Sequence, residues 1–580
     1  MCKAGFILQA ACMVLGAMPV VAQQAGNPVI ILSGADQALE SNIRGSLNLD
    51  AEPCDSSLLR LQRLLPGIRN SARIAAEALG YYESSVSPQF LPGEGCWELH
   101  ILIEPGRQVM LREVNLRIDA DTRDAVLFNP LLEEAGLNSG EPLHHGRYEE
   151  LKSRLSAVAS DNGYFEARFN QAEITVHTAD YAADITLDFD PGSRFRFGAF
   201  SLNKSEALSD ELIDRLMTLK EGDFYSTASL AGLRRELDNS EYFRQIRISP
   251  QLGQAAGQAV PVILDLDLRP RHSWTSGIGF TTDTGPRARV EYQNRFINRS
   301  GHKFQTDASV STVRAQTNGS YIIPVDSPIA QSIGLNLGFV SENNDAFESK
   351  RFVGGISLPK DGESGWRRTI ALDFQRDDYL AGSDQDVSVL MLPGINYTRT
   401  RADDLINPAN GWKLFASLKG ASDALLSDTS LLQFYASGKH VVSFGRGRVL
   451  SRIDLGTTLT NNASELPASL RFYAGGDRSV RGYDFNTLSP SDPVTQDILG
   501  GKNLVAGSLE YDYLVGQNWR FAIFADTGNA FDNNSDFELK QSAGIGIRWL
   551  SPIGPLRLDL AHPFDSDESF RIHITMGPDL

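Results

Sequence analysis

The second half of the sequence is a series of short segments in which apolar and polar residues alternate, without any helical spacing. We count about sixteen such segments from Ser273 onward, each about ten residues long and followed by turn-forming residues. The last segment is the clearest, with Phe570, Ile572, Ile574 and Met576 alternating with Arg571, His573 and Thr575. A period of two puts successive side chains on opposite faces of a strand, so this half is predicted to be all-β.

Segment length separates a transmembrane barrel from a soluble β-sandwich. A sandwich also alternates, but its apolar faces meet inside, and it rarely needs so many aromatic ends on ten-residue strands. About 310 residues over sixteen strands leave ~19 residues for each strand and its connection, as tilted bilayer-spanning strands require. We therefore predict a 16-stranded antiparallel transmembrane β-barrel over residues 272–580, with a soluble sandwich as the alternative.

The start of the chain indicates export. Residues 1–22 combine Lys3, an apolar run and the small-residue site Val20-Val21-Ala22, the layout of a signal peptide. Export leaves Cys54 and Cys96, which we expect to form a disulfide in an oxidising compartment; two buried free thiols are the alternative. The net charge of −18 argues against a nucleic-acid partner.

Between these regions the chain repeats one pattern three times. Helical spacings lead into an aromatic step, GYYESSV, GYFEARF and then EYFRQIRI, and an apolar strand follows each step. The steps are 83 residues apart from Tyr82 to Phe165 and 78 apart from Phe165 to Phe243. We predict three small α+β units of order strand-helix-helix-strand-strand, over residues 23–106, 107–192 and 193–271. In the third unit, Ser240-Glu241 replaces the glycine before the aromatic pair, which puts the turn there in question.

Four motifs in the barrel region then resemble a known family. They are SVRGYDF at 479–485, FADTG at 524–528, GIGIRWLSPIGPLRLDLAHP at 544–563 and NPANGWKL at 407–414. Together with the three repeats they are similar to the outer-membrane assembly superfamily that includes BamA, TamA and the two-partner secretion transporters, whose periplasmic repeats are called POTRA domains. Three POTRA units and the ending MGPDL resemble its TamA-type members.

The resemblance makes Val480, Arg481, Gly482 and Tyr483 the motif of a loop that folds into the barrel. A charge in a narrow lumen is costly unless paired, and the alternation places Asp526, Glu510 and Asp512 on the lumen face. We expect Arg481 to pair first with Asp526, within the Phe524-Asp526-Gly528 motif, while Gly544 and Gly546 leave room for the loop. The alternative is an arginine on a solvated outer turn.

Barrel closure requires the first strand, expected at 274–283, to meet the last, expected at 569–576. Gly277 and Gly279 weaken the first strand, and Gly577-Pro578 removes an amide donor at the end of the last. The family implies a seam that opens laterally there. We expect Ile278 to face Ile574, next to Met576.

The resemblance implies an insertase in the bacterial outer membrane, with its POTRA domains in the periplasm. It would insert unfolded outer-membrane proteins or autotransporters through the seam, with outer-membrane lipid around it and a TamB-type inner-membrane-anchored partner. A two-partner-type secretion pore and a passive porin are the alternatives. We find no metalloprotease, nucleophile-elbow or P-loop motif, and the pair His144-His145 is expected at the surface, so no enzymatic activity, metal or cofactor is expected.

Overall fold

The structure is a computed structural model that describes residues 28–49, 52–93, 95–119, 122–325, 331–362, 364–382, 384–460, 465–533, 537–551, 554–566, 569–577 and 579. The expected signal peptide and Pro578 lie outside these residues. None of the helices described here has both the length and the apolar character that a membrane crossing requires.

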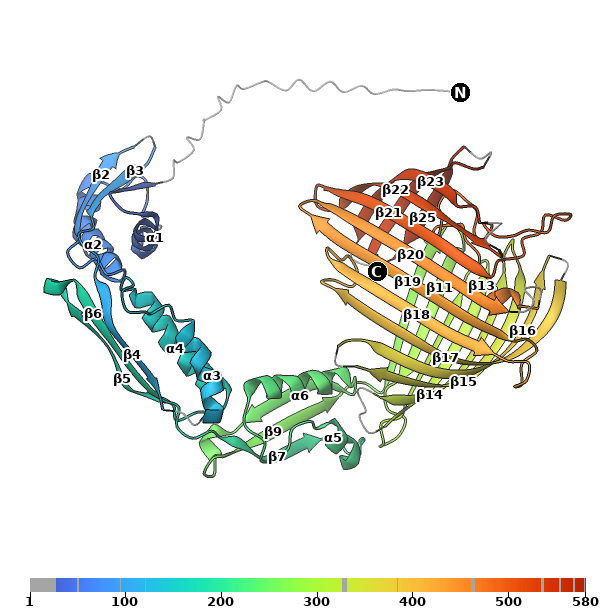
Figure 1. The fold of residues 1–580 in the computed structure, drawn as a ribbon, viewed down its shortest axis with the longest axis horizontal. Coiled ribbons are helices and arrows are strands. Elements are labelled where there is room, and N and C mark those ends of the chain that lie inside the picture. The colour runs from blue at the N-terminus through green and yellow to red at the C-terminus, as the bar shows by residue number, and fades with distance from the viewer. Residues whose placement is uncertain are drawn as a thin grey trace, which may run out of the picture. The chain divides into compact units, whose positions relative to one another are not determined.

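The first α+β unit is a three-stranded sheet with two helices packed on it (Figure 1). Its elements are β1 (Val29–Ser33), α1 (Gln37–Ser46), α2 (Leu58–Glu77), β2 (Ser85–Pro92) and β3 (Trp97–Glu104). The strand order is β1-β3-β2, with β1 parallel to β3, so β1 and β2 are free edges. Leu39 and Ile43 of α1 share one core with Leu99 and Ile101 of β3, since helix and strand periods both turn their apolar residues to this face. Cys54 and Cys96 are joined by a disulfide.

The second and third units repeat this order of elements. The second consists of β4 (Met110–Ile118), α3 (Thr122–Glu133), α4 (His145–Asp161), β5 (Arg168–His177) and β6 (Ala182–Asp190), and the third of β7 (Arg196–Lys204), α5 (Asp210–Leu216), α6 (Thr227–Asn239), β8 (Phe243–Pro250) and β9 (Ala259–Leu268). Their sheets have the orders β4-β6-β5 and β7-β9-β8. Short 3-10 turns lie at Thr178–Asp180 and Leu252–Gln254.

The aromatic step keeps its backbone conformation in all three units. Gly80 and Gly163 precede the aromatic residues with φ of 88° and 85°, and Glu241 takes the same left-handed conformation with φ of 62°. The turn in question at Tyr242 is therefore present, and the third unit forms it with a residue for which this conformation is strained.

The two adjacent histidines are partly buried rather than at the surface. His144 accepts the amide hydrogen bond of Arg147 through Nδ1 and so caps α4, and His145 Nε2 lies 2.7 Å from the Tyr82 hydroxyl. Burial lowers the pKa of both imidazoles. The sequence placed this pair at the surface, and the structure half-buries it. The contact with Tyr82 could not be predicted, because its hydroxyl comes from the preceding unit and no local pattern shows it.

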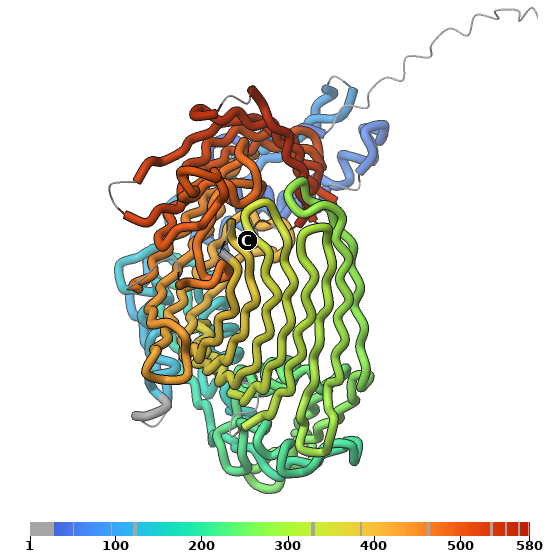
Figure 2. Tube along the Cα trace, turned by 90° about the vertical axis from the view of Figure 1, so that its right-hand side faces the viewer, coloured from blue at the N-terminus to red at the C-terminus, as the bar shows by residue number. Residues whose placement is uncertain are grey.

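From His272 the chain forms one sixteen-stranded sheet in which each strand pairs antiparallel with the next (Figures 1 and 2). Its strands are β10 (His272–Thr281), β11 (Gly285–Asn294), β12 (Lys303–Val310), β13 (Arg314–Pro324), β14 (Ser332–Asn343), β15 (Glu348–Asp361), β16 (Arg367–Ala381), β17 (Asp384–Ala402), β18 (Gly411–Ala421), β19 (Leu431–Phe444), β20 (Gly447–Thr460), β21 (Asn503–Val515), β22 (Trp519–Phe531), β23 (Lys540–Ser551), β24 (Gly554–Pro563) and β25 (Arg571–Met576). This confirms a nearly closed 16-stranded antiparallel barrel.

The two faces of the barrel wall differ in chemistry, as the alternation predicts. On β22, Trp519, Phe521 and Ile523 are exposed on the outer face, whereas Arg520 and Asp526 are buried inside. Because every second residue turns outward, an apolar outer surface and a charged lumen come from the same strands.

Candidate functional site

A long loop between β20 and β21 folds into the lumen and packs against its wall. We call residues 471–502 the inward loop; a short 3-10 turn, Ala468–Leu470, precedes it. Val480 is fully buried and shares an apolar cluster with Leu504 and Ala506 of β21 and Ala530 of β22. The sequence SVRGYDF therefore sits inside the barrel rather than on a solvated outer turn.

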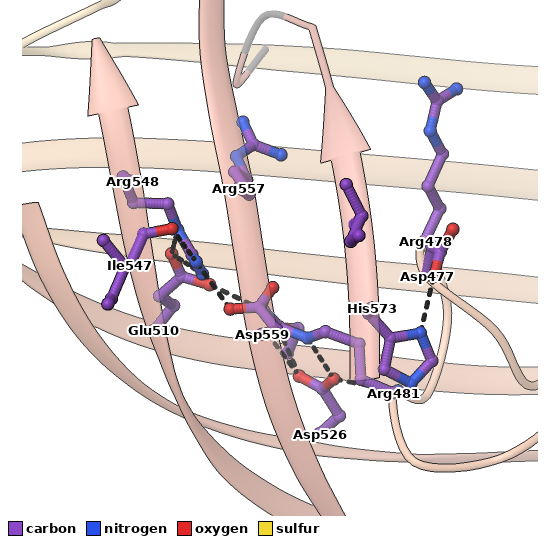
Figure 3. Close-up of polar contacts among 12 residues, drawn as sticks. Asp477, Arg478, Arg481, Glu510, Asp526, Ile547, Arg548, Arg557, Asp559 and His573 are labelled. Carbon is purple, nitrogen blue, oxygen red and sulfur yellow. Dashed lines mark hydrogen bonds and ion pairs between the residues drawn. The ribbon is translucent and has the colours of Figure 1, made fainter. Parts of the chain in front are cut away.

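Arg481 of the inward loop binds carboxylates from three strands (Figure 3). Its Nε and Nη2 donate to the two oxygens of Asp526 on β22, at 2.8 and 3.0 Å, and its backbone amide donates to the same carboxylate at 3.1 Å. Nη1 donates to Glu510 on β21 at 2.8 Å and to Asp559 on β24 at 3.1 Å. The contact expected between Arg481 and Asp526 is thus present, in the two-pronged geometry that suits a guanidinium and a carboxylate.

Phe524 lies directly beneath this guanidinium. The Cζ atom of Arg481 is 3.4 Å from the centre of the Phe524 ring, a cation–π contact. The ring needs the bare glycine on the neighbouring strand, because a Cβ at Gly544 would lie 2.3 Å from its Cζ atom. Gly528, in the same motif, brings β22 against β21, since a Cβ there would lie 2.8 Å from the Cα of Ala506.

A second arginine completes the network from the barrel wall. Arg548 on β23 donates to Glu510 at 2.9 Å and to Asp559 at 2.5 Å. A Cβ at Gly546 would lie 2.0 Å from the Asp559 carboxylate, so this glycine makes room for the ion pair rather than for the loop itself. Two guanidinium groups and three carboxylates, Asp526, Glu510 and Asp559, are therefore buried together. We call them the arginine network.

Asp512 does not bind Arg481, contrary to the expectation that it would share this role with Glu510. It pairs with Arg448 of β20 at 2.6 Å and with Arg520 of β22 at 2.9 Å. The alternation puts both acids on the lumen face correctly, but two residues along a strand are about 6.6 Å, and only Glu510 is level with the loop. The alternation gives the face on which a residue lies, but not its position along the barrel axis.

The other motif residues fix the loop in place. Gly482 has a φ of 96°, a conformation that favours glycine, and a Cβ on it would lie 3.2 Å from the Pro563 nitrogen, so there is little room for a side chain. Its amide donates to His573 Nε2 at 2.8 Å. Tyr483 donates its hydroxyl to the Gln541 carbonyl at 3.1 Å. The inward loop is therefore bound to β21, β22, β23, β24 and β25.

The seam differs from its prediction in register. β10 begins and ends two residues earlier than expected, and β25 is shorter, from Arg571 to Met576. In the described part of the chain, hydrogen bonds between the two barrel edges link Thr282 with Ile574: amide to carbonyl at 3.1 Å, and amide to hydroxyl at 2.6 Å.

Ile278 therefore does not face Ile574, and its side chain is 90 % exposed. The alternation fixes which face a residue takes, whereas seam register depends on the shear of the closed barrel. The expected weakening residues are in place. Gly277 and Gly279 lie within β10, and Gly577 follows Met576, with its amide bound to the Pro555 carbonyl at 3.3 Å.

Several residues of the site were missed by sequence reasoning. Arg548 and Asp559 stand at polar positions of their alternating segments, which was the available signal, but nothing in the pattern links them to Arg481. A further group was not anticipated. Asp283, Asp477 and His573 bring their polar atoms within 4.8 Å of one another, and among described residues they form the one cluster of the size that could hold a metal ion. They are far apart in sequence, and no spacing points to them.

Comparisons with known proteins fit this architecture. Residues 297–579 match the Omp85 superfamily domain, and residues 30–105 match the POTRA domain TamA domain 1. The outer membrane protein assembly factor BamA of Nitratidesulfovibrio vulgaris is 24% identical over 73% of this chain, and that of Neisseria meningitidis serogroup B is 22% identical over 74%.

The chain spans 56% and 63% of the length of those two relatives. The crystal structure of Haemophilus ducreyi BamA lacking POTRA domains 1-3 superposes with a TM-score of 0.65 at 17% identity, and covers 81% of this chain and 99% of that one.

Proposed function

Because the chain joins an Omp85 superfamily domain to a TamA-type POTRA domain, we propose that it is an outer-membrane protein assembly factor that inserts β-barrel or autotransporter clients through its seam. The barrel lies in the outer membrane and the POTRA domains in the periplasm. The names of the BamA relatives support the assembly role, and their partial coverage makes activity and clients part of the proposal.

The observation that carries the proposal is the contrast between the braced part of the barrel and its seam. Four of the last five strands, β21 to β24, share the buried arginine network with the inward loop. In contrast, the described hydrogen bonds between the first and last edges of the sheet link Thr282 with Ile574. Free strand edges template the pairing of another strand, so a seam held by few bonds is the place for client strands to add.

The insertion experiment uses the full chain in lipid vesicles and a urea-unfolded outer-membrane barrel as client. We expect the client to fold faster than in empty vesicles. A Thr282→Cys/Ile574→Cys variant should lose this acceleration when oxidised and regain it on reduction. The parent chain, with the Cys54–Cys96 disulfide, is the control for the redox treatment itself. Full acceleration after verified crosslinking would exclude the seam as the path.

The secretion pore is a separate candidate in which the lumen is the path. A polypeptide that passes through the lumen would have to displace the inward loop, whose Val480 and Arg481 are buried against the wall. Channel recordings separate the two: we expect small, unstable conductances for the assembly factor, and large steady ones would favour a pore.

A TamB-type inner-membrane-anchored partner is proposed to dock on the first POTRA domain. Residues 30–105 are the part that matches TamA domain 1, and β1 offers a free edge with Val29 and Ile31 exposed. An Ile31→Lys variant puts a charge on this exposed edge strand and should weaken capture of such a partner, whereas Ile31→Thr leaves the strand uncharged and should not. The proposal includes no enzymatic activity.

A further inference from the structure

A second polar cluster lies where both edges of the barrel meet the inward loop. Asp283 is in the turn after β10, Asp477 is in the inward loop, and His573 is on β25. None of the three belongs to the arginine network. They join the first strand, the last strand and the loop, which are 96 or more residues apart along the chain.

Asp283 and Asp477 hold each other through their backbones. The Asp477 amide donates to the Asp283 carboxylate at 2.6 Å, and the Asp283 amide donates to the Asp477 carboxylate at 3.1 Å. Gly476 makes this approach possible, because its φ is 99° and a Cβ on it would lie 2.4 Å from Asp283 Oδ2. The turn after β10 is thus bound to the inward loop.

His573 binds the same loop from the other edge of the seam. Its Nδ1 lies 2.5 Å from Asp477 Oδ1 (Figure 3). Its Nε2 lies 2.8 Å from the Gly482 amide nitrogen. A backbone amide can only donate, so Nε2 is an acceptor and carries no proton. The neutral ring therefore has its proton on Nδ1 and donates it to Asp477. The side chains of His573 and Asp477 are 1% and 2% exposed.

This proton assignment argues against a metal site at Asp283, Asp477 and His573. A metal ligand must offer a free nitrogen lone pair, but one nitrogen of His573 carries the proton and the other accepts from Gly482. Asp477 is then the link between the two barrel edges: it accepts from the Asp283 amide on one side and from the His573 ring on the other.

We propose that Asp283, Asp477 and His573 form a clasp by which the inward loop holds the Thr282 end of the seam shut, so that the seam opens only when the loop releases one edge. The role of this opening in client entry rests on the proposed function, whereas the closure itself does not. The clasp makes the loop a bridge across the seam as well as a brace of the lumen.

The test measures seam width directly, with spin labels on Ile278→Cys and Ile572→Cys in the full chain in vesicles. Both side chains are exposed on the outer surface, at 90% and 56%, so labels there leave the clasp intact. The two hydrogen bonds that Asp477 accepts fall on different carboxylate oxygens, Oδ2 and Oδ1. Asp477→Asn keeps the size of the side chain, but its one oxygen can accept only one of these bonds, and its NH2 group faces the other donor. Gly476→Ala drives Asp283 away.

We expect one narrow label distance in the parent chain. Asp477→Asn and Gly476→Ala should add a longer distance, with the ratio of open to closed molecules raised about tenfold or more, as for lost hydrogen bonds to a charged group. His573→Gln keeps an acceptor near Gly482 and loses the donor to Asp477, and should open the seam; His573→Asn keeps that donor and should open it less.

Ser349→Ala is the matched control. It removes a buried hydrogen bond of 2.6 Å to Asp377 between β15 and β16, away from the seam, and should leave the label distance unchanged. If Asp477→Asn folds and gives the parent distance, the clasp is refuted. A chelator should change nothing, and a seam that opens on chelation would overturn the clasp in favour of a bound cation.

Client folding is measured on the same samples, so the two proposals fail separately. An open Asp477→Asn seam with unchanged client folding would leave the clasp standing and remove the seam from the proposed function. A closed seam in that variant would refute the clasp, whatever its effect on clients.

Discussion

Removing the guanidinium of Arg481 should destabilise the barrel more than removing Asp526, and the two losses should not add. In Arg481→Ala, Asp526 loses its two-pronged partner, and the buried network keeps three carboxylates with Arg548 alone. Breaking a buried pair in this way costs about 3–5 kcal/mol. In Asp526→Ala, Arg481 keeps Glu510 and Asp559, so the expected cost is about 1.5–3 kcal/mol, the value for hydrogen bonds to charged groups.

The double variant should lose no more stability than Arg481→Ala alone. The coupling energy between Arg481 and Asp526 is then about 1.5–3 kcal/mol. Urea unfolding of the full chain in vesicles, followed by tryptophan fluorescence of the barrel, measures all four corners of this cycle. Arg481→Lys keeps the charge but not the two-pronged geometry of the guanidinium. Its stability should therefore lie between that of the parent chain and that of Arg481→Ala.

Arg367→Ala is the matched control for this cycle. It removes an exposed two-pronged pair with Asp361, worth at most about 1 kcal/mol. Additive losses, or an Arg481→Ala cost no larger than that of the control, would refute the arginine network as the brace of the loop.

Three other outcomes follow from the structure. Gly546→Ala should destabilise the barrel in the same urea assay, because its Cβ would overlap the Asp559 carboxylate, whereas Gly277→Ala, with open space around it, should be tolerated; equal costs would contradict the packing argument. Burial lowers the pKa of His145, so the unfolded state binds its proton more readily, and the second POTRA unit should lose stability as pH falls below the unfolded value of about 6.5. Hydrogen exchange of α4 at pH 7.5 and 5.5 measures this loss of stability. His145→Gln should reduce the pH dependence, and His144 should supply the part that remains. Reducing the Cys54–Cys96 disulfide, whose cysteines are 42 positions apart in the sequence, should cost the first unit about 4 kcal/mol by loop entropy. This loss is read as faster hydrogen exchange in β1, β2 and β3, with β4, β5 and β6 unchanged as the internal control.

Much of the arginine network could be predicted from residue type and alternation alone. Glu510, Asp526, Arg548 and Asp559 all fell on the polar face of their strands, and Arg481 stood in a loop that needed partners. What the pattern lacked was height along the barrel axis. It therefore gave Arg481 a partner in Asp512, which lies one pleat away with Arg448, and left Asp559 unassigned.

The seam and its clasp show the same division between local and global information. The glycines of β10 could be read from the sequence, but which residue of β10 meets Ile574 could not, because closure adds a shear that no single strand encodes. Asp283, Asp477 and His573 meet only because the loop, the first turn and the last strand converge in space.

The spacing of apolar residues along the chain sets the period of each segment, and with it three α+β units, sixteen strands and a wall that is apolar outside and charged inside. Side-chain direction follows from the local backbone, which is why these conclusions needed no contacts. Which charges meet, where the seam lies in register and that Asp477 links both barrel edges emerge from the folded barrel and not from the spacing. Those depend on barrel shear and on the path of the inward loop, which sum over the whole closed sheet.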